Sequence, residues 1–230
     1  MKIVVTTRCL NELDKIERFV YSYSFADVIV VSDGGSTDGS LELLQKYDKV
    51  KVVNFSKRKE FPDGSFWNPD NPHIQHAINC GKEENPDWLI LDDIDDVPNY
   101  LLREKARDLL WTVEFPQVNA FRLYMWGEDK YFPEMNRRLD EAYTSLWAWK
   151  PDKLDIKADL DKHHGTIIGT TNTDVYKIKP PMCLLHYSWN PETIDKKLEH
   201  YKKVGIDMAH PFDMKNAGTA VDIPEWAKWK

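Results

Sequence analysis

The segment VIVVSDGGSTDGS, residues 28–40, passes from four β-branched residues into a turn of glycines, aspartates and hydroxyl side chains. Branched apolar residues favour a strand. Asp33 directly follows the strand-like run, and the glycines after it let the backbone turn sharply and approach a ligand closely. The hydroxyl-rich stretch that comes next is typical of a helix start. The segment therefore predicts a strand, a tight turn and a helix, with a carboxylate where the strand ends.

The same alternation continues on both sides of this segment. Apolar runs at 3–6, 50–55 and 88–91 predict three more strands, and helical spacing of apolar residues predicts helices after Asn11, after Ser40 and near 74–81. Strands that alternate with helices form a mostly parallel sheet whose two faces the helices cover. Ligands of such sheets bind beyond the carboxyl ends of the strands. Residues 1–110 are therefore expected to form a Rossmann-like α/β half with a binding site at that edge.

The pattern changes after the fourth expected strand. A helix is expected over 99–111 and a long strand over 118–126, and a stretch rich in tryptophan, charge and proline follows. A late helix is expected to begin at Asn190-Pro191, because proline suits the first helical position, and to end at Gly205. Neither an internal repeat nor a linker composition separates the parts. Residues 111–230 are therefore expected to form a mixed lid half of the same single domain.

The composition narrows the class of protein. A chain of 230 residues fits one domain with a substantial core. The formal charge of −7 argues against a broad nucleic-acid surface, which would carry a basic patch. Three cysteines without a C-x-x-C pair indicate reduced thiols in a cytosol-like compartment. Because no apolar run approaches a membrane span and the first one is too short for a signal peptide, a soluble, cytoplasmic protein is expected.

A second acidic cluster lies in WLILDDIDDVPNYLL, residues 88–102, directly after an apolar run. On an extended segment residues two apart share a face, so Asp93 and Asp95 can project together. Crowded carboxylates repel, and one pKa rises unless a cation lies among them. Oxygen ligands favour a hard ion such as Mg²⁺ or Mn²⁺. The alternative is an acidic, solvated loop that caps the next helix.

Together the two clusters indicate a nucleotide site. A carboxylate at Asp33 suits a ring N–H or a sugar hydroxyl rather than a phosphate, while an ion held by Asp93 and Asp95 would bind the diphosphate. The alternative for Asp33 is a purely structural turn, with Ser36 or Asp38 capping the helix.

Other classes of protein remain open to different degrees. A nucleotidyltransferase would also use acidic metal ligands, but TTRCLNELDK, residues 6–15, offers no glycine-rich loop for a triphosphate. A Rossmann dehydrogenase is disfavoured because no G-x-G-x-x-G follows the first strand. The alternative that is not an enzyme is a catalytically silent module that binds a sugar or a nucleotide.

Three motifs in this order resemble the family 2 glycosyltransferases of the GT-A fold. They are TTRCLNE at 6–12, VIVVSDGGSTDGS at 28–40 and WLILDDIDDVP at 88–98. The likeness covers residues 2–110 and weakens afterwards, although PPMCLLHYSWNPETIDKKLEHYKK at 180–203 is similar to the late H-Y segment of that family.

The resemblance implies a GT-A fold, a nucleoside-diphosphate donor (a UDP-sugar above all), a Mn²⁺ or Mg²⁺ ion, inversion at the anomeric carbon and a hydroxyl acceptor such as a glycan. It makes residues 1–110 the nucleotide-sugar half and 111–230 the acceptor-side half. The residues it assigns are Thr6, Arg8 and Glu12 beside the nucleotide, Asp33 at the base or ribose, Asp93 and Asp95 as the D-x-D pair, and His186 near the metal or diphosphate. A histidine between Leu185 and Tyr187 is equally often a core residue whose ring nitrogens are hydrogen-bonded inside the protein.

The sequence departs from the family pattern at two places. Many relatives carry paired aspartates where this chain has Asp33-Gly34, and some carry a His-Glu pair where it has His164-Gly165. An inverting transfer needs a carboxylate within reach of the acceptor hydroxyl. Because the glutamate of that pair is missing here, the base must come from another segment.

The segment YMWGEDKYF, residues 124–132, supplies candidates for this base beside aromatic side chains. Asp129 is the first choice, Glu128 the second and Asp161 a distant third, against the alternative of a solvated turn. Trp126 and Trp149 are candidate walls of an acceptor groove, although tryptophan most often lies in the core.

Overall fold

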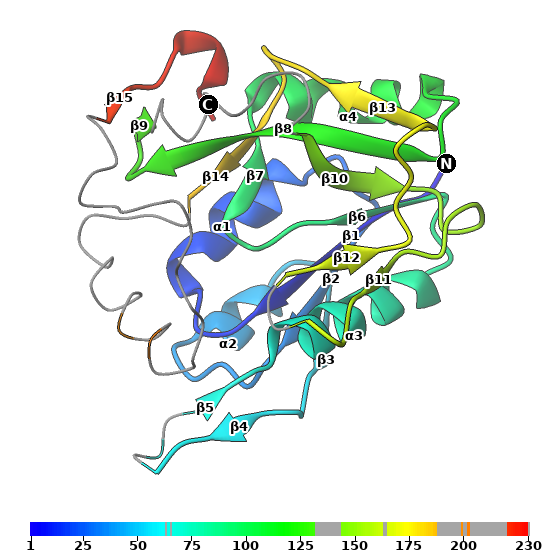
Figure 1. Cartoon of the computed structure of the whole chain (residues 1–230). Helices are drawn as coiled ribbons and strands as arrows, with labels where there is room; N and C mark the ends of the chain where they lie inside the picture. Colours follow the sequence, from blue (N-terminus) through cyan, green and yellow to red (C-terminus); the bar gives the residue numbers. More distant parts are fainter. Residues whose placement is uncertain are drawn as a thin grey trace.

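The computed structural model describes residues 1–62, 64, 66–131, 144–162, 165–187, 199, 202 and 220–229. Four neighbouring parallel strands form one end of its main sheet: β1 (Ile3–Cys9), β2 (Val28–Asp33), β3 (Val50–Asn54) and β6 (Trp88–Leu91). β1 lies between β2 and β6, and β3 follows β2, all in parallel pairs. The register places Cys9 opposite Asp33 and Thr6 opposite Leu91. The two acidic segments therefore meet at one edge of the sheet, as the sequence predicts (Figure 1).

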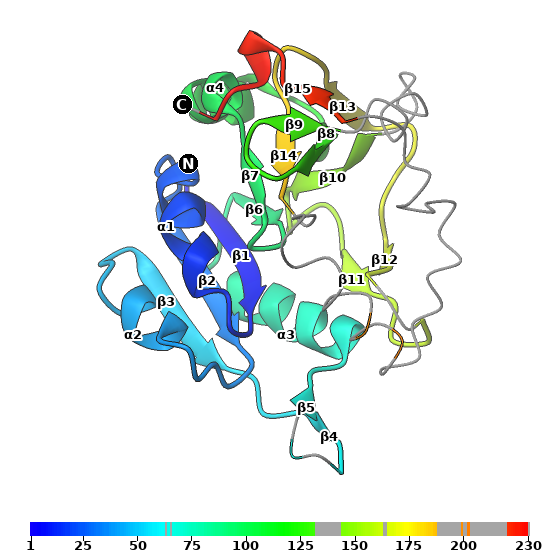
Figure 2. The same cartoon turned by 90° about the vertical axis from the view of Figure 1, so that its left-hand side faces the viewer.

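Helices cover both faces of this sheet, as Figure 2 shows for α1 and α3 on either side of β1. The helices are α1 (Leu13–Ser22), α2 (Ser40–Leu44), α3 (Asp70–Glu83) and α4 (Tyr100–Thr112). Successive side chains of a strand point to opposite faces. Ile3 and Val5 accordingly pack in the core cluster that contains α1 residues, whereas Val4 packs in the cluster that contains α3 residues.

Two local features differ from the sequence prediction. α3 begins at Asp70, four residues before the expected start, because Pro72 lies in its first turn, where the missing N–H costs no helical hydrogen bond. The hairpin of β4 (Lys59–Glu60) and β5 (Phe66–Trp67) lies between the strand expected over 50–55 and the helix expected near 74–81, where no strand was predicted. Two-residue strands are too short to show a periodic pattern.

The second half of the chain extends the same sheet. β8 (Gln117–Trp126) and β10 (Thr144–Trp149) are antiparallel, and β10 pairs with β6, so the order β8-β10-β6-β1 joins both halves. β7 (Asp96–Pro98) pairs with β14 (Leu184–His186), which also pairs with β8. The remaining described elements are β9 (Lys130–Tyr131), β11 (Lys157–Ala158), β12 (Ile167–Ile168), β13 (Val175–Ile178), β15 (Val221–Asp222) and the 3₁₀ helix Glu225–Ala227.

The tryptophans of the second half occupy different environments. Trp149 is fully buried and packs with Val4 and Ile78, so the expectation that it flanks an acceptor groove is wrong. Trp126 is only half-buried and stays a candidate for such a wall. In the part of the chain that the structure describes, no helix combines the length and apolar character that crossing a membrane requires.

Candidate functional site

The four aspartates that follow β6 differ in exposure. Asp92 and Asp96 are buried, at 3% and 2% exposure, whereas Asp93 and Asp95 between them are half-buried. The segment is not extended throughout, because Ile94 and Asp95 form a turn in which the Asp96 N–H donates to the Asp93 carbonyl at 2.8 Å. One acidic motif thus supplies two carboxylates to the interior and two to the edge of the sheet.

Arg122 of β8 neutralises the interior pair. Its guanidinium donates to Asp92 at 3.0 Å, to Asp96 at 3.0 Å and to the Ser145 hydroxyl at 2.9 Å. The Tyr23 hydroxyl donates to the other oxygen of Asp92. Burial and the neighbouring Asp96 carboxylate hold the pKa of Asp92 well above its ordinary range. Arg122 was not among the expected site residues, because nothing in the local pattern of β8 distinguishes it from an exposed arginine.

His186 reaches the same cluster from β14. The β7–β14 register places it opposite Asp96, and its Nδ1 lies 2.7 Å from an Asp96 oxygen. The next backbone N–H, that of Tyr187, donates to the Asp95 carbonyl at 2.8 Å. Burial lowers the pKa of His186, but the Asp96 and Asp95 carboxylates outweigh it, and the net shift is upward. The histidine is therefore tied to the acidic segment rather than satisfied in an apolar core.

Asp95, Asp96 and His186 form a group that fits a divalent cation. One ligand atom from each lies within 4.8 Å of the others. Two carboxylates suit Mg²⁺ or Mn²⁺, and an imidazole is an ordinary third ligand for a transition metal. Asp96 was not among the expected ligands. Its position in the acidic motif, directly after Asp95, is the sequence feature that could have indicated it. Asp93, which was expected to be a ligand, is not in this group.

Asp93 instead pairs with Arg8, which projects from the end of β1. Arg8 donates to Asp93 at 3.0 Å and to Asp70, in the first turn of α3, at 2.6 Å. Burial alone would raise the pKa of Asp93, but the guanidinium outweighs it and lowers that pKa to about 2. Asp93 is therefore ionised and held in position at neutral pH. Its role as a metal ligand stays a prediction.

Asp33 is engaged within its own turn. Its carboxylate accepts hydrogen bonds from the backbone N–H groups of Gly35 and Ser36 at 2.9 and 3.1 Å, and from the Ser36 hydroxyl at 2.6 Å. A Cβ added at Gly34 would lie 1.7 Å from the side-chain amide nitrogen of Asn68, so a larger residue there would require the buried Asn68 side chain to move. These contacts fit a structural role for the turn, although the N-cap of α2 is Gly39 and neither Ser36 nor Asp38. A contact of Asp33 with a nucleoside stays a prediction.

Thr6 and Glu12, the other expected nucleotide neighbours, lie in different surroundings. The Thr6 side chain is fully buried and donates to the Ala77 carbonyl at 2.7 Å, so it faces α3. Glu12 accepts from Lys15. Burial and, to a smaller extent, Asp95 raise the pKa of Glu12 against the opposing effect of Lys15. Glu12 and Lys15 are thus within electrostatic reach of Asp95, whereas the Thr6 side chain is not directed to the cluster.

The candidate bases lie in the turn between β8 and β9. Glu128 and Asp129 are both exposed there. Arg18 of α1 donates to Glu128 at 2.5 Å and lies over the Tyr187 ring, 4.1 Å from its centroid. Contacts therefore link Glu128, but not Asp129, to the strand that carries His186. Asp161 is exposed on the β11–β12 connection, and His164 lies outside the described residues. Of the late helix expected from Asn190 to Gly205, the structure describes Glu199 and Lys202, both helical.

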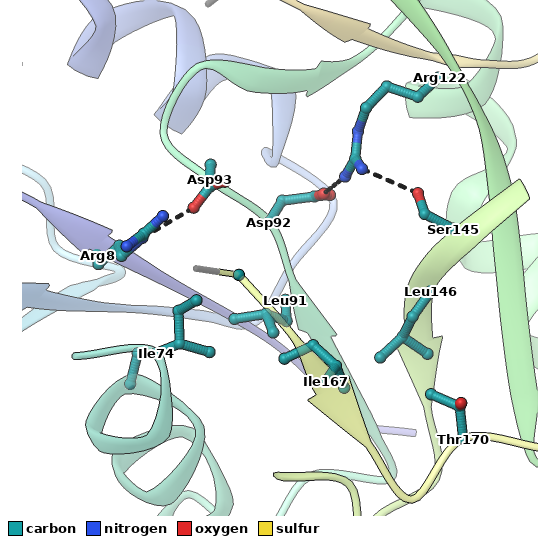
Figure 3. A pocket seen from close by; sticks show the side chains of 12 residues that line it. Arg8, Ile74, Leu91, Asp92, Asp93, Arg122, Ser145, Leu146, Ile167 and Thr170 are labelled. Carbon is teal, nitrogen blue, oxygen red and sulfur yellow. Dashed lines mark hydrogen bonds and ion pairs between the residues drawn. The ribbon is translucent and has the colours of Figure 1, made fainter. Parts of the chain in front are cut away.

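A cavity of about 300 Å³ opens beside these side chains. Figure 3 shows the Arg8–Asp93 pair and the Asp92–Arg122–Ser145 chain along one side of it. Residues of α3, β6, β10 and β12 complete its walls. The acidic motif therefore borders a space of the size that a small ligand requires.

Comparison with known proteins identifies the architecture through structure rather than sequence. No family model matches the chain, and no curated protein matches it. The chain is similar to TarS of S. aureus, with a TM-score of 0.55 at 12% identity over 94% of this chain and 41% of that one. The 1–349 fragment of TarS in complex with UDP gives 0.53 at 11% identity over 94% and 68%. The chain has the GT-A fold.

A further GT-A structure resembles this chain over a shorter stretch. It is the glucosyl-3-phosphoglycerate synthase of Mycobacterium tuberculosis with Mn²⁺, UDP and glucosyl-3-phosphoglycerate, at a TM-score of 0.44, 20% identity and 66% of this chain. The chain spans 57% of that synthase's length. In the GT-A fold described here, the 6–12, 28–40 and 88–98 motifs all lie at the carboxyl edge of the parallel strands.

Proposed function

We propose that the protein is a metal-dependent, inverting glycosyltransferase that moves a sugar from a UDP-sugar to a hydroxyl acceptor. The observation that carries this proposal is the group of Asp95, Asp96 and His186 beside the cavity at the edge of a GT-A sheet. The UDP complex of the TarS fragment, which has the same fold, supports the choice of nucleotide.

Asp95, Asp96 and His186 are the residues that would hold Mn²⁺ or Mg²⁺. Such an ion stabilises the negative charge that grows on the leaving nucleoside diphosphate. The protein groups have separate tasks around it. Arg122 fixes the Asp96 carboxylate, Asp96 orients the His186 ring through Nδ1, and Arg8 holds Asp93 ionised at the cavity rim.

A carboxylate of the β8–β9 turn is proposed to take the proton of the acceptor hydroxyl. The sequence ranks Asp129 before Glu128. The Arg18 contacts, which tie Glu128 to Tyr187, support Glu128 as the group nearer to the metal ligands. An attack on the side opposite the leaving diphosphate then inverts the anomeric centre.

The proposal is tested by metal-dependent binding of UDP. Isothermal titration calorimetry with and without Mn²⁺ should show that the ion tightens UDP binding. Asp95→Asn should remove that gain, roughly 10- to 100-fold, because ligand and supporting groups of metal sites have effects of this size. The matched control is Asp48→Asn, an exposed aspartate before β3, which should bind UDP as the wild type does.

Two outcomes would count against the proposal. Equal UDP affinity in Mn²⁺ and in chelator would refute the metal role. Metal-dependent UDP binding without slow hydrolysis of any UDP-sugar would favour a silent binding module over an enzyme.

A further inference from the structure

The cavity beside the acidic motif has two chemically different sides. One side carries Arg8 with Asp93 and Arg122 with Asp92 and Ser145. Figure 3 shows these groups paired with one another along the upper part of the view, and aliphatic side chains below them. The aliphatic wall consists of Ile74, Ala77, Leu91, Leu146 and Ile167, and the hydroxyl-bearing Thr170 lies beside Leu146 at its lower end. The cavity is therefore divided into a salt-bridged side and an apolar wall.

The apolar wall is built from four separate elements. Ile74 and Ala77 come from α3, Leu91 from β6, Leu146 from β10 and Ile167 from β12. None of these side chains can donate or accept a hydrogen bond. A ligand hydroxyl placed against them would lose its bonds to water without replacement. A methyl group placed there would leave water favourably.

The size of the cavity limits what can occupy it. About 300 Å³ lies at the lower end of the roughly 300–1,000 Å³ range of small-molecule pockets. A space of this size suits one sugar ring better than a whole nucleotide sugar. Because Asp93 and Arg122 connect the cavity to the ligand group of Asp95 and Asp96, the ring held there would be the one next to the diphosphate.

We propose that the transferred sugar carries a methyl-bearing substituent, which the apolar wall recognises. A 6-deoxy methyl group and an N-acetyl group share this chemistry. The inference rests on the proposed function, since it concerns the sugar of the same donor.

A matched series of donors tests it on the unchanged protein. UDP, UDP-glucose, UDP-6-deoxyglucose and UDP-N-acetylglucosamine are titrated with Mn²⁺ present. Each methyl-bearing sugar differs from glucose at one position, and UDP reports binding without a sugar. At least one of the two methyl-bearing donors should bind about fourfold or more tightly than UDP-glucose, the gain expected from burying one methyl group. The donor whose affinity exceeds that of UDP-glucose identifies the substituent that the wall recognises.

Ile167→Thr examines the wall itself. It replaces one methyl-bearing branch by a hydroxyl on a short strand at the surface, and it should reduce the preference for the methyl-bearing donor while UDP affinity stays the same. The matched control is Ile168→Thr. Ile168 is 47% exposed, points to the other face of β12 and does not line the cavity, so its preference should equal that of the wild type.

The outcomes separate this inference from the function beneath it. Normal metal-dependent UDP binding with equal affinity for all three donors would overturn the inference alone. A preference that survives Ile167→Thr and falls in Ile168→Thr would also overturn it. Absence of UDP binding would overturn both.

Discussion

Aspartates of one short motif have different roles because their surroundings differ. Asp92 is buried between Tyr23 and Arg122, and its pKa is raised, whereas Asp93 lies beside Arg8 and its pKa falls to about 2. Burial disfavours a charged carboxylate, and a nearby cation favours it. Residue type and spacing give the motif its acidity, but each side chain's charge state depends on partners from other elements.

The choice of base is a prediction at this scale. Glu128→Gln should lower the transfer rate about 100-fold or more, as removal of a general base typically does, with UDP-sugar affinity unchanged. Asp129→Asn is the matched variant one residue away. Single-turnover rates and donor titrations would decide between them. Loss of turnover in Asp129→Asn alone would identify Asp129 as the base, as the sequence ranks it. Unchanged rates in both variants would show that neither residue of the β8–β9 turn is the base.

At the scale of elements, the site depends on strands that are distant in sequence. Arg122 of β8 reaches Asp92 and Asp96 of the β6–β7 segment, and His186 of β14 reaches Asp96 from 90 positions away. Periodicity predicts β8, which carries Arg122, because it is a local property, but it does not predict the three-residue strands β7 and β14. It cannot predict which strands pair, and so the contacts of Arg122 were missed.

Arg122 should therefore matter for stability as well as for the site. Arg122→Met removes the guanidinium that the two buried aspartates share and leaves Asp92 with only the Tyr23 hydroxyl and Asp96 with only His186, so it should lower the free energy of unfolding by about 3 kcal/mol. Arg122→Lys keeps the charge and should lose less. Urea unfolding at neutral pH measures both changes.

The matched control for this measurement is Arg107→Met. Arg107 is 43% exposed and pairs with the exposed Asp27, so its replacement should cost at most about 1 kcal/mol. An Arg122→Met protein as stable as this control would show that Tyr23 and His186 suffice to keep Asp92 and Asp96 buried.

At the scale of the whole molecule, the two halves share one sheet and one core. β10 lies between β6 and β8, and the largest core cluster contains residues of both halves, among them Phe19, Ile90, Val118, Trp147 and Leu184. The division into a nucleotide-sugar half, 1–110, and an acceptor-side half, 111–230, stays a prediction. A break near residue 110 would expose apolar side chains on both sides.

A fragment of residues 1–110 should therefore fail to fold by itself. Without β10 and β14, the strands β6 and β7 lose pairing partners and the core loses the aromatic side chain of Trp147. We expect no cooperative urea transition and no near-ultraviolet circular dichroism from the fragment, while the full chain unfolds in one step. A cooperative transition in the fragment would show that the halves are independent domains.

The sequence by itself determined the alternation of strands and helices, the glycine-bearing turn after β2 and the position of the acidic motif at the end of β6. These depend on local spacing and on the conformations that each residue allows. Only the tertiary structure decided that Asp96 rather than Asp93 joins Asp95 and His186, that Arg122 neutralises the buried aspartates, and that aliphatic side chains of four elements wall the cavity. Such contacts follow from how strands distant along the chain pair and pack, and no local pattern encodes that pairing.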